Sequence, residues 1–270
     1  MISSAIDFAI KDSAKYETAR QKCSWAKPAL LLLCTSILFL SGCASRPPSS
    51  SPQAPASVLT DSRATSVGEF QEPNYKALIT AVKQQHGPVA AARVAYWADL
   101  IKKGKTQEEL EKLNATNRFF NGAQFLSDQE IWQQEDYWAT PIEFLIKDAG
   151  DCEEFSIAKY LTLDLMGVDI DKMRITYVKA ETLNQPHMVL AYYENTDSTP
   201  LILDNINPRI LPANLREDLV PVYSFNGKTL WLARSRNEQV ESGSPDQMKF
   251  WRDLTTNIAR EFKSSSNSKN

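Results

Sequence analysis

The sequence predicts an α+β domain, with helices in its first half and an antiparallel sheet in its second half. Up to Gly167, apolar residues recur every three to four positions, which is typical of amphipathic helices. Beyond Gly167, apolar and polar residues alternate over 173–179, 187–193 and 201–206, which predicts three strands. Asn226-Gly227 lies between two more alternating runs and strongly indicates a β-hairpin.

Composition narrows the classes of function that the chain can have. The chain has 270 residues and a net charge of −3, without a basic patch, so nucleic acid is excluded as a partner. Of the four cysteines only Cys152 lies beyond the leader, which excludes a disulfide framework. The two histidines, His86 and His187, are too few for a Cys/His zinc site. A cysteine–histidine mechanism would therefore use Cys152 and one of these two.

The N-terminal segment predicts export and lipidation. Basic residues precede an apolar run over 29–40, which is shorter than the roughly 20 residues of a membrane span. Leu40-Ser41-Gly42-Cys43 follows and resembles the lipobox of bacterial lipoproteins, in which the cysteine is lipidated. We expect a signal peptide with a lipobox over 1–43 and a periplasmic protein with a lipid anchor to the membrane. Ala44 favours the outer membrane; an ordinary signal peptide and an uncleaved anchor are the alternatives.

The remaining chain divides into a linker, a domain and a tail. Residues 44–72 are rich in Ser, Pro and Ala, which predicts a flexible tether. The folded domain is expected over 73–263, and its final helix begins at Ser244-Pro245. The polar tail over 264–270 is expected to be disordered.

Three helices are expected at the start of the domain. The spacing of apolar residues predicts helices over 74–85 and 88–103, with a break at Gly87. A capping-box pattern over 106–109 predicts the start of a third helix. The aromatic and amide-rich stretch over 117–125 is interpreted as a loop that packs on the core.

A helix start precedes the cysteine. Thr140 as N-cap, Pro141 at the first helical position and Glu143 three residues after the cap predict a helix that runs to about 148. Gly150 would then turn the chain into Cys152. Two helices joined this tightly would fix the position of the thiol.

Cys152 lies at the predicted N-terminus of the next helix, where the helix dipole favours a thiolate. A cysteine can also be a small buried hydrophobe, and these residues alone leave both interpretations open. The neighbouring acids Asp151, Glu153 and Glu154 oppose thiolate formation unless a histidinium or a bound cation offsets them.

His187 and Asp204 are expected to lie side by side. His187 begins one predicted strand and Asp204 is near the end of the next, and adjacent ends of an antiparallel hairpin meet. Asp204 follows an apolar run, so its carboxylate needs a partner there. It would accept the imidazole N–H and so orient His187, or it would cap the turn that follows the strand.

Seven short blocks in this order resemble the bacterial transglutaminase-like cysteine proteinases, which have a papain/transglutaminase-like fold. The blocks are Asp136-Tyr-Trp-Ala-Thr-Pro141, Gly150-Asp-Cys-Glu153, Ile157-Ala-Lys-Tyr160, Thr176-Tyr-Val-Lys179, His187-Met-Val-Leu-Ala-Tyr-Tyr193, Leu203-Asp-Asn205 and Pro221-Val-Tyr-Ser-Phe-Asn226. The resemblance implies that Cys152 is the nucleophile, His187 the general base and acid, and Asp204 the group that orients the histidine.

The resemblance also implies a substrate, a cofactor and a partner. Proteases of this type cut the N-terminal region of a large biofilm adhesin, near a pair of small residues, and free it from the cell surface. They need calcium, and Asp151 and Glu153 match the acids linked to calcium. Glu154 stands where the family commonly has aspartate. An inner-membrane receptor that senses cyclic di-GMP sequesters such proteases.

Two other functions remain compatible with the same residues. One is a transglutaminase-type acyl transfer to an amine, and the other is a non-catalytic lipoprotein that only binds a partner. In the protease interpretation, the Cys152 backbone N–H and one side-chain donor would hold the oxyanion. Gln133, Gln134 and Trp138 are the candidates for that donor.

Overall fold

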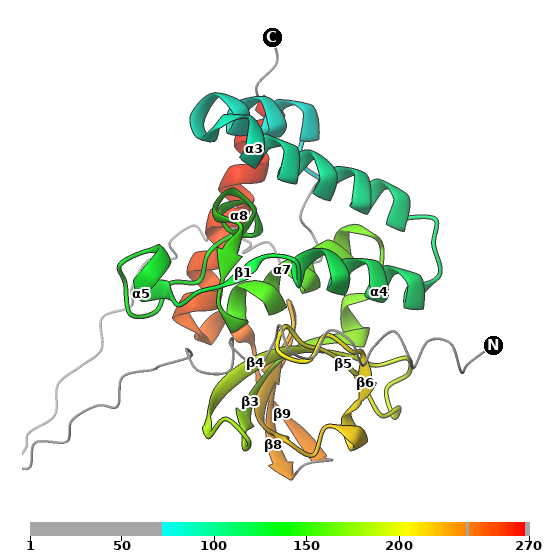
Figure 1. Ribbon diagram of the computed structural model, residues 1–270. Helices are drawn as coiled ribbons and strands as arrows, with labels where there is room; N and C mark the ends of the chain where they lie inside the picture. The colour runs from blue at the N-terminus through cyan, green and yellow to red at the C-terminus, as the bar shows by residue number, and fades with distance from the viewer. Residues whose placement is uncertain (1–71, 236–237, 268–270) are drawn as a thin grey trace, which may run out of the picture. The chain divides into compact units, whose positions relative to one another are not determined.

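The computed structural model describes residues 72–235 and 238–267 (Figure 1). The predicted signal peptide and lipobox over 1–43, and all but the last residue of the predicted tether over 44–72, lie outside these residues. In the part of the chain that is described, none of the helices combines the length and the apolar character that crossing a bilayer requires.

The predicted α+β class is confirmed. The α-helices are α3 (Tyr75–Gly104), α4 (Glu109–Phe120), α5 (Asp128–Ile131), α6 (Pro141–Lys147), α7 (Cys152–Leu165) and α8 (Lys249–Asn267). The strands are β1 (Gln124–Phe125), β2 (Ala149–Gly150), β3 (Met173–Ala180), β4 (Gln185–Tyr192), β5 (Leu201–Leu203), β6 (Leu211–Pro212), β7 (Leu219–Phe225), β8 (Leu230–Ser235) and β9 (Glu238–Gly243). Three short 3₁₀ helices, η3 (Ile170–Lys172), η4 (Ala213–Leu215) and η5 (Pro245–Gln247), complete the described elements.

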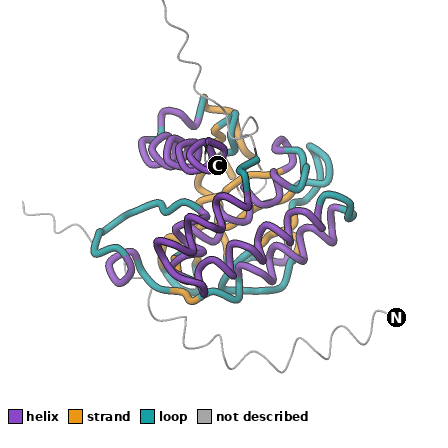
Figure 2. The backbone as a smooth tube through the Cα atoms, turned by 90° about the horizontal axis from the view of Figure 1, so that it is seen from above, coloured by secondary structure: helices purple, strands orange, loops and turns teal. Residues whose placement is uncertain are grey.

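Seven strands form one antiparallel sheet in the order β6-β5-β4-β3-β7-β8-β9. The predicted hairpins are confirmed, because β4 pairs with β5 and β7 pairs with β8 across Asn226-Gly227. The edge strands β6 and β9 were not predicted, since β6 has two residues and β9 is mostly polar. The helices α3, α4 and α7 lie together on one side of this sheet (Figures 1 and 2).

Helix α7 is the centre of the domain. Every side chain from Cys152 to Leu163 is buried, so this helix packs on all its faces. The Trp97 indole N–H on α3 donates to the Thr162 hydroxyl at 2.8 Å, and the Tyr160 hydroxyl accepts from the Gly227 N–H at 2.9 Å. These bonds tie α7 to the N-terminal helices on one side and to the β7–β8 turn on the other.

The two faces of the sheet carry two apolar clusters. The larger cluster contains α7 together with alternate residues of β3 and β4, such as Ile175 and Leu190. The smaller cluster lies on the opposite face and contains the intervening residues, such as Val178 and Val189. Alternation along the strands, read from the sequence, therefore separates the two faces correctly.

The first helices differ from the expectation in two places. The break at Gly87 is confirmed, because its φ of 86° interrupts α3, and His86 beside it is exposed. The predicted helix start at Thr106 is wrong. The Thr106 hydroxyl donates to the Lys103 carbonyl at the end of α3, so α4 begins later, at Glu109. The predicted loop over 117–125 is also partly wrong, because its first turn belongs to α4.

The C-terminal elements are displaced by a few residues. The strand predicted over 201–206 ends at Leu203. The final helix begins at Lys249, because Ser244 caps the 3₁₀ helix η5 instead. This helix continues to Asn267, so the predicted disordered tail is helical over 264–267. Ser265 is buried there and its hydroxyl donates to the Phe262 carbonyl at 2.6 Å.

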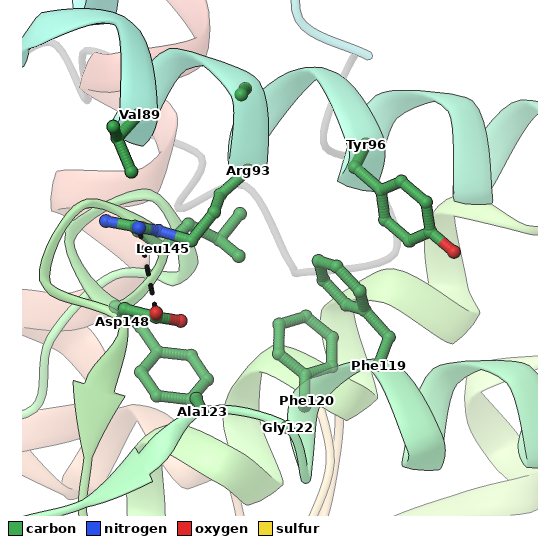
Figure 3. A pocket seen from close by; sticks show the side chains of 11 residues that line it. Val89, Arg93, Tyr96, Phe119, Phe120, Gly122, Ala123, Leu145 and Asp148 are labelled. Carbon is green, nitrogen blue, oxygen red and sulfur yellow. Dashed lines mark hydrogen bonds and ion pairs between the residues drawn. The ribbon is translucent and has the colours of Figure 1, made fainter.

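Arg93 on α3 fixes the end of α6, the helix that leads toward Cys152 (Figure 3). Its guanidinium donates to the carbonyls of Leu145 at 2.6 Å and Ile146 at 2.7 Å, which are free at a helix C-terminus. It also forms an ion pair with Asp148 at 3.6 Å. Charged donors at helix C-terminal carbonyls are stabilising.

Arg93→Met is expected to lower the free energy of unfolding by about 1–3 kcal/mol, because two carbonyls lose a charged donor. Asp148→Asn removes only the partly exposed ion pair and should lower it by at most about 1 kcal/mol. Urea unfolding measures both. Equal losses in the two variants would mean that the ion pair, and not the carbonyl bonds, holds α6.

Candidate active site

The approach to Cys152 follows the predicted path. Thr140 and Glu143 form the capping box at the start of α6, and Asp148 ends this helix in the left-handed conformation, with φ 55°. At Gly150 a Cβ atom would lie 2.7 Å from the Glu154 side chain and 2.9 Å from that of Phe144, so only glycine fits. The chain can therefore pass directly from α6 to the start of α7.

Glu154 fixes the first turn of α7. One of its carboxylate oxygens accepts from the Asp151 N–H and the other accepts from the Ala139 N–H, both at 3.0 Å. This capping box places Cys152 at the first helical position, as predicted, and only 4% of its surface is exposed. Glu154 thus joins α7 to the segment before α6.

His187 and Asp204 form a direct hydrogen bond. The distance between His187 Nε2 and Asp204 Oδ1 is 2.8 Å, and each residue is only 1% exposed. The register pairs Leu190 with Leu203, so the end of β5 lies beside β4 three residues after His187. Asp204 Oδ1 also accepts from the Ile206 N–H at 2.8 Å, so the residue both orients the histidine and caps the turn.

Arg216 is a further member of this network that the sequence did not reveal. Its Nη2 donates to Asp204 Oδ2 at 2.8 Å, and its Nε and Nη2 both donate to Asp218 at 2.9 Å. Burial alone would raise the pKa of Asp204, but His187 and Arg216 hold it well below its usual range. Arg216 lies in a polar loop after η4 and belongs to no motif, so nothing in the sequence marked it.

A buried lysine places α7 beside the same aspartate. Lys159 lies two turns after Cys152 and is 1% exposed. Burial lowers its pKa to about 7, and the negative charge of Asp204 acts in the opposite direction. Lys159 of α7 therefore lies within electrostatic reach of Asp204.

The thiol and the imidazole are not hydrogen-bonded in this structure. Cys152 Sγ contacts Glu153 Oε2 at 3.2 Å, as donor to the carboxyl group. His187 Nδ1 is buried and has no hydrogen-bond partner among the described residues. Because Asp204 occupies Nε2, Nδ1 is the ring nitrogen that remains for proton exchange.

Five buried or half-buried acids gather around Cys152. Asp128 and Asp136 join the predicted residues Asp151, Glu153 and Glu154, and ligand atoms of several triads among them lie within 4.8 Å of one another. Four carboxylate oxygens of this acid cluster are buried and have no hydrogen-bond partner in the described part of the chain: Asp128 Oδ1, Asp136 Oδ1, Asp151 Oδ1 and Glu153 Oε1. Unpartnered buried oxygens at this density indicate a place for a cation.

Burial and neighbouring acids raise the pKa values of Asp128, Glu153 and Glu154. Burial raises the pKa of Asp128 to about 7, with Asp151 as the next cause. Burial, and then the neighbouring acids, also raise the pKa values of Glu153 and Glu154 well above their usual range. Without a cation, these carboxyl groups therefore hold protons at pH values at which exposed acids are ionised.

Comparison with known proteins identifies the family. The family model for the bacterial transglutaminase-like cysteine proteinases matches residues 95–218. The structure of EGTA-treated LapG from Legionella pneumophila is 38% identical in sequence, with a TM-score of 0.62, and the match covers 70% of this chain and 99% of that chain. This chain belongs to the bacterial transglutaminase-like cysteine proteinases. No curated protein matches the sequence significantly.

Two other structures of Legionella LapG agree with this assignment. One is 37% identical, with a TM-score of 0.62, and again the match covers 70% of this chain and 99% of that chain. The other is calcium-bound, is 39% identical and has a TM-score of 0.59, with 67% of this chain and 97% of that chain covered. The predicted family and fold are therefore confirmed.

The acid cluster of this proteinase fits a hard cation. Asp128, Asp136, Asp151 and Glu153 each present an unpartnered buried oxygen, which is the ligand type that calcium prefers. Both oxygens of Glu154 already accept backbone N–H groups, so this predicted ligand has a structural role as well. The sequence analysis missed Asp128 and Asp136, because neither lies near Cys152 in the chain.

The three side chains predicted as possible oxyanion donors differ in whether their N–H groups already have a hydrogen-bond partner. The indole of Trp138 is buried, and its N–H donates to Asp136 and lowers the pKa of that carboxyl group. Gln133 and Gln134 are exposed in the segment before α6. The Trp138 N–H is thus already engaged in the acid cluster.

Asp128→Asn is expected to raise the melting temperature of the calcium-free proteinase by a few degrees at pH 7.5 and to leave it unchanged below about pH 4. The pKa of Asp128 is higher in the folded state than in the unfolded state, so the wild type loses stability as the pH rises from about 4 to 7. A few degrees correspond to about 1 kcal/mol in a domain of this size.

Thermal unfolding in EGTA across this pH range measures the effect. Asp99→Asn, which removes an exposed acid paired with Lys103 on α3, is the matched control and should give no such pH-dependent gain. A lower melting temperature for Asp128→Asn at pH 7.5 would show that repulsion in the acid cluster is not destabilising.

Proposed function

We propose that this protein is a calcium-dependent cysteine endopeptidase that cuts the N-terminal region of a large surface adhesin and so controls biofilm attachment. The buried His187–Asp204 hydrogen bond, in a LapG-like proteinase whose central helix begins at Cys152, carries this proposal. A non-catalytic binding protein would not need a buried imidazole bonded to Asp204, whose other oxygen is held by Arg216.

The reaction proceeds through a thioester. His187 Nδ1 takes the proton of Cys152, and the sulfur forms a bond with the scissile carbonyl carbon. His187 then gives this proton to the leaving amine as the C–N bond breaks. Nδ1 next removes a proton from water, the hydroxide displaces the sulfur, and the thiol is restored. Asp204 accepts the hydrogen bond from the Nε2–H group throughout and keeps the ring oriented.

Asp204 performs this role across the neutral pH range. Three donors contact its carboxylate, from His187, Ile206 and Arg216, which keeps its pKa low. The carboxylate is consequently always ionised when the imidazolium forms. Arg216 also prevents the Asp204 carboxylate from rotating, because it holds Oδ2 while His187 and Ile206 hold Oδ1.

Asp128, Asp136, Asp151 and Glu153 would hold calcium beside the nucleophile. Bound calcium supplies positive charge that offsets the carboxylates, which favours the thiolate of Cys152. The thiol of Cys152 donates to Glu153, one of these four residues. The residues of the acid cluster thereby couple the state of the sulfur to the charge around it.

The proposed setting is the periplasm. The lipobox at Cys43 and the polar tether after it support a lipid anchor, with the outer membrane favoured by Ala44. An anchored protease on a tether could reach adhesin at the cell surface. An inner-membrane receptor for cyclic di-GMP is the proposed inhibitor, on the basis of the family resemblance alone.

His187→Ala is expected to lower the rate of adhesin cleavage by at least about 10³-fold, because the thiol loses its base. His86→Ala is the matched control and should cleave at the wild-type rate, since His86 is exposed at the break in α3. Cys152→Ala should not cleave. Gel analysis of the purified N-terminal region of an adhesin measures all three.

Cleavage by Cys152→Ala, or equal losses in the two histidine variants, would contradict the proposed nucleophile and base. Covalent incorporation of a fluorescent alkylamine into the adhesin, without cleavage, would instead establish acyl transfer to an amine.

Removal of calcium with EGTA is expected to lower the rate of cleavage at least ten-fold at pH 7.5, and excess calcium should restore it. Without the positive charge of calcium, nothing in the acid cluster offsets the cost of placing a negative charge on the sulfur. Magnesium, which prefers a stricter octahedral geometry, should restore less activity. Full activity in EGTA would exclude the acid cluster as a functional calcium site.

A further inference from the structure

Two tyrosines on neighbouring strands form a stacked pair near Cys152. Tyr177 on β3 and Tyr223 on β7 are direct cross-strand partners, with ring centroids 5.0 Å apart and planes within 7°. Both rings pack against the larger apolar cluster, which includes Cys152. Tyr177 also pairs with Met188 on β4, which belongs to the same cluster. The pair therefore lies on the face of the sheet that the nucleophile helix covers.

The backbone is irregular at this point. The register between β3 and β7 shifts after Tyr177, so that Val178 pairs with Pro221 and Val222 is left without a partner. Val222 is 44% exposed, and Pro221 has no N–H to lose. Such a β-bulge redirects the side chains beside it and is common next to active sites.

Buried aromatic rings of the core hold the tyrosine pair in place. Tyr223 stacks on Phe225 at 6.3 Å, and Phe225 is fully buried against Trp138 and Trp251. The two tyrosines are thus the half-exposed end of a row of aromatic rings that begins in the core. A side chain fixed in this way loses little entropy when it binds a ligand.

The phenol groups are available as donors. Among the described residues neither hydroxyl has a hydrogen-bond partner, and both rings are partly exposed. Burial raises the pKa of Tyr177, and the charges of Cys152, Glu153 and Asp136 add to this. Burial and Tyr177 raise the pKa of Tyr223 to about 12, so both groups remain protonated at neutral pH.

We propose that Tyr177 and Tyr223 form a substrate-positioning wall beside Cys152, where their hydroxyls donate to main-chain carbonyls of an extended peptide next to the scissile bond. The flat rings would bound the site on one side, and the two donors would set the register of the peptide relative to the sulfur. This inference rests on the proposed peptidase function.

Tyr177→Phe with Tyr223→Phe in the full-length, calcium-loaded protein tests this wall, because the rings remain and only the donors are lost. The double variant is expected to lower kcat/KM for cleavage of the adhesin region at least ten-fold. Its melting temperature, and the rate at which iodoacetamide alkylates Cys152, should stay within experimental error of the wild type, since iodoacetamide has no peptide chain to position.

Tyr96→Phe is the matched control. Tyr96 is 63% exposed on α3 and stacks on Phe119 in a separate groove, so cleavage should not change (Figure 3). Wild-type cleavage by the double variant would overturn the inference. Equal losses of cleavage and alkylation would also overturn it, because the tyrosines would then act on the thiol and not on the peptide.

A second measurement separates this inference from the proposed function. If the wild type leaves the adhesin region intact, the peptidase proposal fails. The inference is then tested by protection of Cys152 from iodoacetamide. The protection given by acetyl-dialanyl aldehyde, which has a peptide chain, is compared with that given by acetaldehyde, which has none. Protection by the peptide aldehyde that is at least ten-fold weaker in the double variant supports the wall, and equal protection in the two proteins overturns it.

Discussion

The burial of negative charge at the start of α7 is the constraint on which the site depends. Five carboxyl groups lie around one thiol, at a position where few polar partners are available. The chain satisfies some of their oxygens with its own backbone. Glu154 accepts from Asp151 and Ala139, and Asp128 accepts from the Tyr137 N–H at 2.6 Å. These bonds shape the segment before α6 and the first turn of α7 together.

Asp204 is a second site of buried negative charge, and there both carboxylate oxygens have hydrogen-bond partners. Asp204 is also almost fully buried, but an imidazole, a guanidinium and a backbone N–H contact its two oxygens. Its pKa is therefore lowered, while the pKa values of Glu153 and Glu154 are raised. The structure thus contains one carboxylate that is ionised at every relevant pH and a group of carboxyl groups whose charge depends on what is bound. The first suits a permanent orienting role, and the second suits a site that responds to a cation.

The sequence was sufficient to predict the elements whose determining residues lie close together in the chain. The Asn226-Gly227 hairpin, the cap at Thr140 and the position of Cys152 all follow from residues within one turn of each other. It was insufficient where partners come from distant segments. Asp128, Asp136 and Arg216 acquire their roles only when the fold brings them to Cys152 and Asp204. The predicted helix start at Thr106 was wrong for a related reason. The Thr106 hydroxyl forms a hydrogen bond with the helix before it and not with the helix after it.

The contacts of the thiol connect these observations. Cys152 donates to Glu153, whose raised pKa reflects the uncompensated acids around it, and His187 Nδ1 is left without a partner. A thiol that bonds a carboxyl group is poorly placed to lose its proton, whereas one that faces an imidazole is well placed. Among the described residues, no acid of the cluster contacts Asp204, whose oxygens accept from His187, Ile206 and Arg216. The acid cluster instead contacts the site at the sulfur, through the bond between Cys152 and Glu153. The orientation of the imidazole and the environment of the thiol are therefore set by two separate groups of residues.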